Sequence, residues 1–252
     1  MFENDIEWIF PEKIEKVYES LKKEGSRIHS GGLTLNRLRP SNVKTLIDLQ
    51  KTGLDFLSIE QGIIQIGPYL SVGEFIERSK DLKKDGNILV FLADVFSNAG
   101  STSIRNRMTI GGSVVGAPSW SDIIPPLVAV DAKIEIFSGE KKQIDILELI
   151  NNKPQKPFVV TKITVKDQDL NWFYRRLTNV RFDYPYMNFC AVRSNEKVKC
   201  VLRGSEERIK IFDIEEYKNE KIIFRDDMYF SADYKRHLLD IYIKETKENL
   251  GC

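Results

Sequence analysis

Two pairs of adjacent glycines are the residues whose type and spacing indicate chemistry. The first pair lies within residues 30–35 and the second within residues 101–114. Glycine has no Cβ, so such a segment can adopt positive φ and let backbone N–H groups approach a ligand closely. Successive N–H groups form a concavity suited to phosphate, and the hydroxyls of Thr109 and Ser113 add further donors. Two such segments predict a diphosphate held from two sides.

Each glycine pair taken alone is a weak indication, since most such dipeptides only form turns. The chain contains no G-x-G-x-x-G fingerprint and no G-x-x-x-x-G-K motif followed by Ser or Thr. The Rossmann and P-loop modes of phosphate binding are therefore excluded. The hypothesis depends on the two pairs acting together.

An α/β unit precedes the first glycine pair and positions it. A short apolar run at residues 6–10 predicts a strand, and Pro11 opens a helix that we expect Gly25 to end. Residues 27–29 predict a second strand that runs into the first pair, and residues 45–49 predict a third. This β-α-β order, with a loop at the end of the second strand, is a common way to build a phosphate site.

The segments around the second pair predict a hairpin and several helices. Residues 56–66 contain two apolar runs separated by Gln61-Gly62, which is typical of a hairpin turn. Ser71 is placed to cap a helix, and residues 87–98 predict another helix that leads to the second glycine pair. Beyond that pair, a helix with a Ser-Asp cap is expected over residues 122–130.

The rest of the chain predicts a strand-rich region closed by a helix. Strands are expected at residues 133–137, 158–165, 172–177, 188–192, 197–202 and 208–212. The last helix begins at a Ser231 cap, and its expected apolar face carries Tyr234, Leu238, Ile241 and Tyr242.

Length and charge limit the possible functions. At 252 residues the chain can form one large domain or two smaller ones. Its 38 Lys and Arg against 37 Asp and Glu leave a net charge of +1, which disfavours general nucleic-acid binding. No stretch is apolar enough to span a membrane, and the acidic residues 1–5 lack the features of a signal peptide. We therefore expect a cytoplasmic protein.

Side chains that could do chemistry themselves are few. Cys190, Cys200 and Cys252 are odd in number and lack C-x-x-C spacing, and His29 and His237 are the only histidines. Neither a disulfide framework nor a protein-bound metal or iron–sulfur site is expected. Cys190 lies in an apolar run and is expected to be a small buried residue. The sequence also lacks a convincing acid/base pair or nucleophile triad, so we expect no catalytic residues.

The motifs resemble those of a known family, the FAD-binding subunits and domains of molybdenum hydroxylases of the xanthine dehydrogenase and carbon monoxide dehydrogenase medium-subunit type. Residues 109–113 resemble its T-I-G-G-N element, and residues 104–106 match the I-R-N before it. Residues 30–32 are similar to its A-G-G segment, and residues 231–236 to the S-A-E-Y-R-R that opens its last helix. The order and separation of the glycine segments also match, so the resemblance covers essentially the whole chain.

The resemblance implies an α+β fold with FAD as the cofactor. A two-subdomain FAD-binding domain of the PCMH type would occupy residues 1–165, as subdomains 1–53 and 54–165, and a shortened α+β C-terminal domain residues 166–252. The residues implied to hold the diphosphate are Ser30, Gly31, Gly32, Leu33 and Thr34 on one side and Thr109, Ile110, Gly111, Gly112 and Ser113 on the other. Asp122 is implied to contact the flavin or its ribityl chain, whereas the residues alone favour a helix cap there.

Several residues depart from the family's pattern. Leu33 stands where the family usually has a polar residue, Met108 where it has a small one, and Ser113 where it has Asn. A lost hydrogen bond to a charged group typically costs about 1.5 to 3 kcal/mol, but backbone donors remain for FAD. Residues 180–184 keep the family's F-D pair without paired basic residues directly before it, which argues against a role at the flavin ring.

The resemblance implies an electron-transfer flavoprotein. Its flavin would take electrons from the clusters of an iron–sulfur subunit, which drain a molybdopterin subunit, and pass them to NAD or another acceptor. The alternative is a cofactor-free scaffold that keeps the fold and acts in assembly. A flavin reductase of the cell-wall UDP-sugar type fits the I-R-N and S-A-D-Y-K-R segments less well.

Overall fold

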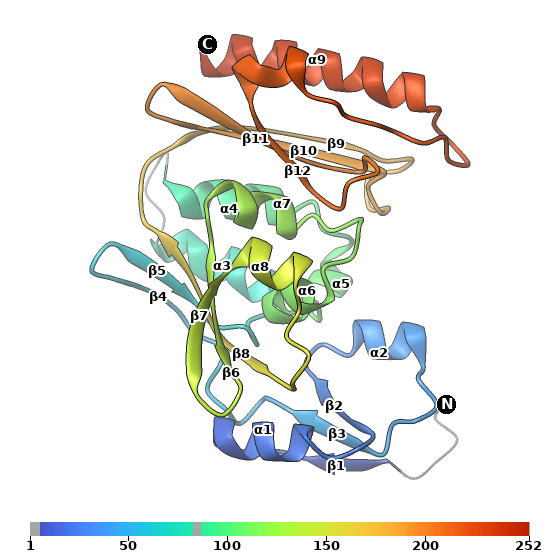
Figure 1. Ribbon diagram of the computed structural model, residues 1–252. Helices are drawn as coiled ribbons and strands as arrows, with labels where there is room; N and C mark the ends of the chain where they lie inside the picture. Colours follow the sequence, from blue (N-terminus) through green and yellow to red (C-terminus); the bar gives the residue numbers. More distant parts are fainter. Residues whose placement is uncertain (1–5, 83–86, 252) are drawn as a thin grey trace. The chain divides into compact units, whose positions relative to one another are not determined.

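Figure 1 shows the computed structural model, which describes residues 6–82 and 87–251 and divides into two compact units. The first unit consists of Met1–Asp81, Thr102–Ala117 and Asp131–Asp167. The second consists of Leu82–Ser101, Pro118–Val130 and Gln168–Cys252. The chain passes between the units several times, and the domain boundaries expected near residues 53 and 165 stay predictions.

The first unit opens with a small parallel sheet whose strand order is β1-β3-β2. Strand β1 (Glu7–Ile9), helix α1 (Ile14–Leu21), β2 (Ser26–His29) and β3 (Thr45–Asp48) confirm the expected β-α-β beginning. Helix α1 packs on one face of the sheet because its fully buried Val17 joins the apolar core there. The first glycine pair follows the carboxyl end of β2 directly in the chain.

One local expectation in this region is wrong, and one helix was not expected. Helix α1 ends at Leu21, and Gly25, which was expected to end it, lies four residues further on. There Gly25 has φ +79°, and an added Cβ would lie 2.8 Å from the carbonyl oxygen of Asn42. A short helix that the sequence did not indicate, α2 (Leu33–Leu38), begins directly after Gly32. It has no side-chain cap and buries none of its residues, so it lacks both usual sequence signals of a helix.

The first unit also contains a five-stranded antiparallel sheet in the order β4-β5-β8-β6-β7. Its strands are β4 (Leu57–Glu60), β5 (Ile63–Ile66), β6 (Lys133–Phe137), β7 (Lys141–Asp145) and β8 (Val159–Lys166). Between β4 and β5, Gln61 and Gly62 have φ values of 51° and 74°, as a type I′ turn requires, so the predicted hairpin is confirmed. Strand β7 was not expected, because only one of its five residues is buried.

Helices complete the first unit. Helix α3 (Val72–Leu82) begins with the predicted cap: Ser71 Oγ accepts from the Glu74 N–H at 3.1 Å, and the Glu74 carboxylate accepts from the Ser71 N–H at 3.1 Å. The remaining helices are α5 (Thr102–Arg105), α6 (Ile110–Gly116) and the unexpected α8 (Ile146–Asn151). Helix α6 packs against β8 and α8, which fixes the second glycine pair on the large sheet.

The second unit is built around a four-stranded antiparallel sheet in the order β12-β11-β10-β9 (Figure 1). Its elements are α4 (Ile88–Phe96), α7 (Ile124–Ala129), β9 (Asn171–Leu177), β10 (Met187–Ser194), β11 (Lys197–Arg203), β12 (Lys210–Asp213), the 3₁₀ helix η1 (Ile214–Asn219) and α9 (Ala232–Leu250). Helix α9 lies against β9 and β10, and α7 lies against β10 and β11 with α4 beside it.

Alternation along β10 assigns its side chains to the two faces of this sheet. Phe189 and Ala191 belong to the apolar core under α9. Asn188 and Cys190 therefore point to the other face, where the Asn188 amide donates to the Ser121 carbonyl at 2.9 Å. Cys190 is fully buried, as predicted. Across the described residues, no helix is long and apolar enough to span a bilayer.

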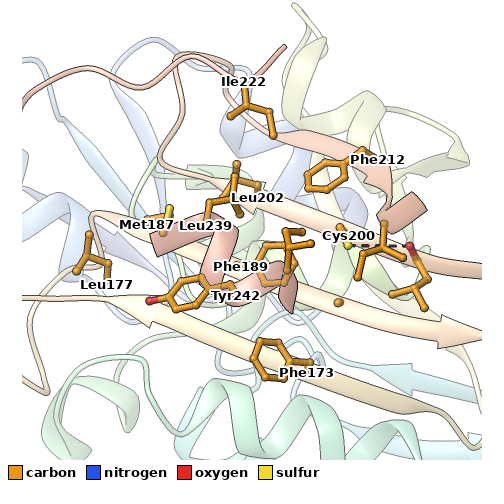
Figure 2. Packing of buried hydrophobic residues seen from close by; sticks show 14 of the residues in the cluster. Phe173, Leu177, Met187, Phe189, Cys200, Leu202, Phe212, Ile222, Leu239 and Tyr242 are labelled. Atoms are coloured by element: carbon orange, nitrogen blue, oxygen red, sulfur yellow. Dashed lines mark hydrogen bonds between the residues drawn. The ribbon is translucent and has the colours of Figure 1, made fainter. Parts of the chain in front are cut away.

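The apolar face predicted for α9 is only partly right. Tyr242 joins the core with Leu239, as Figure 2 shows, but Tyr234 and Ile241 are 45% and 38% exposed. Leu239, Tyr242, Ile243 and Leu250 are the buried apolar residues of this helix. Both sets of residues follow helical spacing, so the sequence contains two overlapping apolar stripes and packing against the sheet selects one.

The stripe that packs can be tested by paired truncations. Leu239→Ala should lower the free energy of unfolding by about 2 to 5 kcal/mol, because it leaves a cavity under a fully buried side chain. Ile241→Ala, two residues along the same helix, should cost less than about 1 kcal/mol. Urea unfolding followed by circular dichroism measures both values, and equal losses would contradict this orientation of α9.

Candidate functional site

The two glycine segments meet within the first unit, although 79 positions separate Ser30 from Thr109. The Thr109 hydroxyl donates to the Ser30 hydroxyl at 3.1 Å. The guanidinium Nε of Arg107 donates to the carbonyl of Gly31 at 3.3 Å. The structure therefore brings together both sets of residues that the sequence singled out as a diphosphate site.

The glycines of the first segment serve two different physical needs. An added Cβ on Gly31 would lie 1.4 Å from the carbonyl oxygen of Arg107, so the two backbones touch in a way that no other residue permits. Gly32 has φ +72°, the left-handed conformation that glycine adopts without strain. Its absent side chain also leaves room for the His29 ring, whose Nε2 would lie 2.7 Å from an added Cβ.

The second glycine pair is not the open turn that the sequence suggested. Gly111 and Gly112 lie in the first turn of α6, which Thr109 caps, and neither has positive φ. Glycine is needed at position 111 for space, because an added Cβ would lie 2.5 Å from the Cβ of Pro68. At position 112 an added Cβ would lie 2.6 Å from the Thr109 hydroxyl. Close packing therefore explains this pair, and the expectation of positive φ is wrong.

The N–H groups of the second segment are already bonded inside the chain. Ile110 donates to the Leu70 carbonyl at 3.0 Å and Gly111 to the Pro68 carbonyl at 2.9 Å. The N–H groups of Gly112 and Ser113 both donate to Thr109, to its hydroxyl at 3.2 Å and its carbonyl at 3.0 Å, and the Ser113 hydroxyl also donates to that carbonyl. Contrary to our expectation, this segment forms a wall of the site and offers no open row of backbone donors.

The first segment has backbone donors that are not bonded. Within the described part of the chain, the N–H groups of Gly31, Gly32 and Leu33 make no hydrogen bond. They follow one another through the left-handed residue Gly32, which is the geometry of an anion-binding concavity. The Thr34 side chain is exposed beside them. The departure at Leu33 removes a polar side chain but leaves its backbone donor in place.

A cavity of about 630 Å³ opens beside the joined segments. Its lining residues are Ser30, Gly31, Tyr69, Ser71, Gly73, Glu74, Glu77, Asn106, Arg107 and Thr109. The lining therefore combines hydroxyl groups, one guanidinium and two carboxylates. This size and polarity suit a ligand of nucleotide dimensions with both phosphate and hydroxyl groups.

Asp122 lies in the second unit and does not cap α7. The hydroxyl of Ser121 performs that function, because it accepts from the N–H groups of Ile123 and Ile124 at 3.1 and 3.2 Å. The interpretation of Asp122 as a cap is therefore wrong. The contact with flavin implied for Asp122 stays a prediction.

The Asp122 carboxylate belongs to a buried polar network that the sequence did not indicate. It accepts from the Tyr174 hydroxyl at 2.8 Å and from the Arg176 guanidinium at 3.0 Å. Arg176 also donates to the carbonyls of Arg181 and Asp183, at 2.7 and 2.9 Å, and so holds the loop between β9 and β10. One sequence pattern could have indicated this network: the alternation of side chains along β9 places Tyr174 and Arg176 on the same face of the sheet.

Burial dominates the electrostatics of this network. It raises the pKa of Asp122 from 3.8 to about 6, although Arg176 and the Tyr174 hydroxyl both favour the charged carboxylate. Burial, reinforced by the charge of Asp122, also raises the pKa of the Tyr174 hydroxyl well above its usual value. Tyr174 therefore stays protonated and remains a donor to the carboxylate.

In the described ranges, no group of three or more His, Cys, Asp or Glu side chains is arranged to hold a metal ion. Cys190 and Cys200 lie on adjacent strands, but Cys200 pairs with Ala191 across the sheet, so the two thiols point to opposite faces. They are buried and free of disulfide bonds.

Comparison with known proteins links the chain to flavoproteins. A family described as the FAD binding domain in molybdopterin dehydrogenase matches residues 3–165. The chain is 23% identical over 251 residues to the uncharacterized protein YgfM of Escherichia coli (strain K12), which covers 93% of this chain and 92% of that protein.

Two solved structures share the fold over nearly the whole chain. Quinoline 2-oxidoreductase from Pseudomonas putida 86 matches with a TM-score of 0.83 and 19% identity, covering 97% of this chain and 96% of the other. Carbon monoxide dehydrogenase from Hydrogenophaga pseudoflava matches with a TM-score of 0.80 and 16% identity, covering 99% and 98%. The predicted α+β fold is thereby confirmed.

The buried carboxyl of Asp122 predicts a pH dependence of stability. The native chain keeps this proton up to about pH 6, whereas an unfolded aspartate releases it near pH 3.8. Because the native state binds more protons between these values, its stability falls as the pH rises from about 4 to 6, by roughly 3 kcal/mol from this group. Asp122→Asn should lack this fall.

Urea unfolding of the wild type and variant across this pH range measures the difference. Asp94→Asn replaces an exposed carboxylate of the same unit and should follow the wild type. Parallel pH profiles for the wild type and Asp122→Asn would contradict the assignment.

Proposed function

Because this chain belongs to the family of FAD binding domains in molybdopterin dehydrogenases, we propose that it binds one FAD through the joined glycine segments. It would act as the electron-transfer flavoprotein subunit of a molybdenum hydroxylase-type oxidoreductase. The observation that carries this proposal is the contact between the segments, in which Gly31 touches the carbonyl of Arg107 and the hydroxyls of Ser30 and Thr109 are bonded.

The residues present fit the diphosphate of FAD. A diphosphate needs converging donors, and the N–H groups of Gly31, Gly32 and Leu33, which make no hydrogen bond with the described residues, would supply them without any side chain. The departure at Ser113 matters little, because its hydroxyl is directed back to the Thr109 carbonyl. Arg107 adds positive charge at the same place. The adjoining cavity of about 630 Å³ leaves room for the rest of a nucleotide.

In such a subunit the cofactor and the chain have different roles. Bound FAD supplies the redox chemistry, accepting and passing on electrons. The chain binds and orients it and contributes no catalytic side chain of its own in this proposal. Electrons would come from an iron–sulfur subunit, which receives them from a molybdopterin subunit, and would leave to NAD or another acceptor. Cys190 and Cys200 are buried in the second unit and apart from the glycine segments in sequence, so a cluster on a partner chain is the simpler source.

One observation favours the alternative of a cofactor-free scaffold. The N–H groups of residues 110–113 are bonded within the chain, so the second segment offers fewer donors than expected for a diphosphate site. The two proposals differ in one directly measurable property. A flavoprotein is yellow as purified and releases FAD on denaturation, whereas a scaffold is colourless once unbound FAD is removed after incubation.

Substitution of Gly31 tests the site. In Gly31→Ala the added methyl would meet the Arg107 carbonyl and force the segments apart, so the affinity for FAD should fall at least tenfold, or about 1.4 kcal/mol. Gly53→Ala is the control, because that glycine has positive φ but no atom within 4 Å of an added Cβ. Titration with FAD, beside circular dichroism of each apo-protein, gives the comparison. Unchanged affinity in a folded Gly31→Ala would exclude this site.

Isolation of the native complex tests the proposed partners. Affinity purification of the chain from its source should bring down an iron–sulfur chain and a molybdopterin chain in stoichiometric amounts. The isolated chain should not oxidise a substrate in steady state, because in this proposal the substrate is oxidised on the molybdopterin subunit. Sustained substrate oxidation by the chain alone would contradict its assignment as one subunit of a complex.

A further inference from the structure

The cavity beside the joined glycine segments is lined by groups of different chemistry. All of its described lining residues belong to the first unit. Gly31 and Arg107 come from the glycine segments, Tyr69 precedes helix α3, and Glu74 and Glu77 lie on that helix. A ligand in this cavity therefore meets a cation, an aromatic ring and carboxylates.

Helix α3 is held directly on the second glycine segment. The Val72 N–H donates to the Met108 carbonyl at 2.7 Å. Ser71 and Thr109 pair as an isolated antiparallel bridge. The start of α3, and with it the carboxylates of its first turns, therefore has a fixed position beside that segment.

The two carboxylates of α3 have different partners. Oε2 of Glu74 accepts from the N–H and the hydroxyl of Ser71, at 3.1 and 2.7 Å, so this side chain is committed to the helix cap. Oε2 of Glu77 accepts from exposed Lys80 at 2.6 Å. A carboxylate has about four acceptor positions, so Glu77 can accept further hydrogen bonds while this ion pair persists. Its charge favours a neutral hydroxyl donor over a phosphate.

Tyr69 presents an aromatic ring whose position is fixed. Its hydroxyl donates to Oδ1 of Asp48 at 3.1 Å, and its N–H donates to the Leu54 carbonyl at 2.9 Å. Burial, followed by the charge of Asp48, raises the pKa of Tyr69 to about 12, so the hydroxyl keeps its proton and this bond. The residue is half-buried and lines the cavity. A fixed, neutral ring of this kind is a platform on which a planar base can stack.

Phosphate is favoured in a different part of the cavity from hydroxyl groups. Nε of Arg107 donates to the Gly31 carbonyl at 3.3 Å, and the two terminal guanidinium nitrogens can donate to a phosphate. Glu77 lies six positions after Ser71, the residue that is bridged to Thr109, which is about 9 Å along the helix axis. The lining is therefore polarised, with phosphate donors at the glycine segments and a hydroxyl acceptor along α3.

We propose that this cavity binds the adenosine diphosphate half of FAD. The adenine ring stacks on Tyr69, and a ribose hydroxyl donates to Glu77. The diphosphate accepts from the Gly31 N–H and from Arg107. This inference rests on the proposed binding of FAD, and it assigns one half of that cofactor to named side chains outside both glycine pairs.

Two features of the cavity favour this half of FAD over the flavin half. The described lining contains no Val, Leu, Ile, Met or Phe side chain that could cover the apolar edge of a flavin ring. The two hydroxyls of a ribose are held side by side by the sugar ring, so one carboxylate can accept from them, as an acidic residue does in dinucleotide-binding folds.

The separate halves of the cofactor test the assignment. ADP and FMN are each titrated calorimetrically into the full FAD-free chain, and each is then used as a competitor of FAD. ADP should bind and compete, whereas FMN, which lacks the base and the ribose, should compete at least about tenfold less well. Competition by FMN at concentrations where ADP does not compete would overturn the assignment.

Analogues that lack one hydroxyl test the role of Glu77. The wild type should bind 2′-deoxy-ADP or 3′-deoxy-ADP about tenfold more weakly than ADP, because a hydrogen bond to a charged group is lost. Glu77→Ala should bind ADP about tenfold more weakly and no longer distinguish it from that analogue. Glu19→Ala is the matched control, since Glu19 forms the same ion pair three residues apart, with Lys22 at 2.6 Å, and should behave as the wild type. Discrimination that persists in Glu77→Ala would overturn this role.

Two substitutions of Tyr69 separate its ring from its hydroxyl. Tyr69→Leu should weaken ADP binding about tenfold, because the stacked ring is lost. Tyr69→Phe loses the same bond to Asp48 but keeps the ring, so it should lose less affinity. Circular dichroism establishes that each variant is folded, and the comparison at Glu77 decides the assignment if Tyr69→Leu is not. Equal losses in two folded variants would overturn the stacking.

The outcomes separate this inference from the proposed function. FAD binding that ADP does not compete with would overturn the inference and leave the flavoprotein intact. ADP binding that depends on Glu77, in a chain that does not bind FAD, would support the cavity as an ADP site and contradict the flavoprotein. Failure of the wild type to bind either ligand would overturn both.

Discussion

The contact between the backbone at Gly31 and the carbonyl of Arg107 is the constraint on which the first unit depends. A Cβ at this position would lie 1.4 Å from that oxygen, so the two segments can approach only because the side chain is absent. The small parallel sheet delivers one segment, and α6, packed on the large antiparallel sheet, delivers the other. The hydrogen bond between Ser30 and Thr109 and the adjoining cavity follow from that approach.

The two joined segments differ in how their backbone N–H groups are bonded. In the second segment every N–H group from Ile110 to Ser113 is satisfied inside the chain, which makes it a rigid wall. In the first segment, the three consecutive N–H groups from Gly31 to Leu33 make no hydrogen bond with the described residues. In the proposed site a ligand would be held mainly by the backbone donors of the first segment, and the departure at Leu33 changes a side chain without removing its donor. This agrees with a chain whose chemistry is supplied by a cofactor.

The second unit depends on a different balance, between an apolar core and a buried charge. The sheet buries one face under α9 with residues such as Phe189 and Leu239 (Figure 2). Its other face holds the carboxylate of Asp122, whose pKa burial raises to about 6 even though Arg176 pairs with it. Arg176 also binds two carbonyls of the loop between β9 and β10, so one guanidinium links that loop to the start of α7. Such a network orders the loop at the cost of burying charge.

The sequence by itself determined the features that depend on neighbouring residues. The hairpin at Gln61-Gly62, the capping box at Ser71 and the cap at Ser231 are set by local turn and cap chemistry, and the structure contains each of them. The strands of both antiparallel sheets are found close to the expected positions, except β7, whose residues are largely exposed. The paired glycines and the motifs around them were also sufficient to indicate the family, which residues 3–165 match.

Only the tertiary structure decided what depends on residues far apart in the chain. It showed that Gly111 is required by Pro68 and not by its own φ, and that, among the described residues, the unbonded N–H groups of the site belong to the first segment. It selected Leu239 over Ile241 as the buried position on α9, because both lie on stripes with helical spacing and only the sheet distinguishes them. It showed that Asp122 forms a buried ion pair with Arg176 and does not cap a helix. The sequence could not indicate this pair, because the two residues are 54 positions apart. Local patterns specify elements, whereas long-range packing decides which atoms of those elements meet.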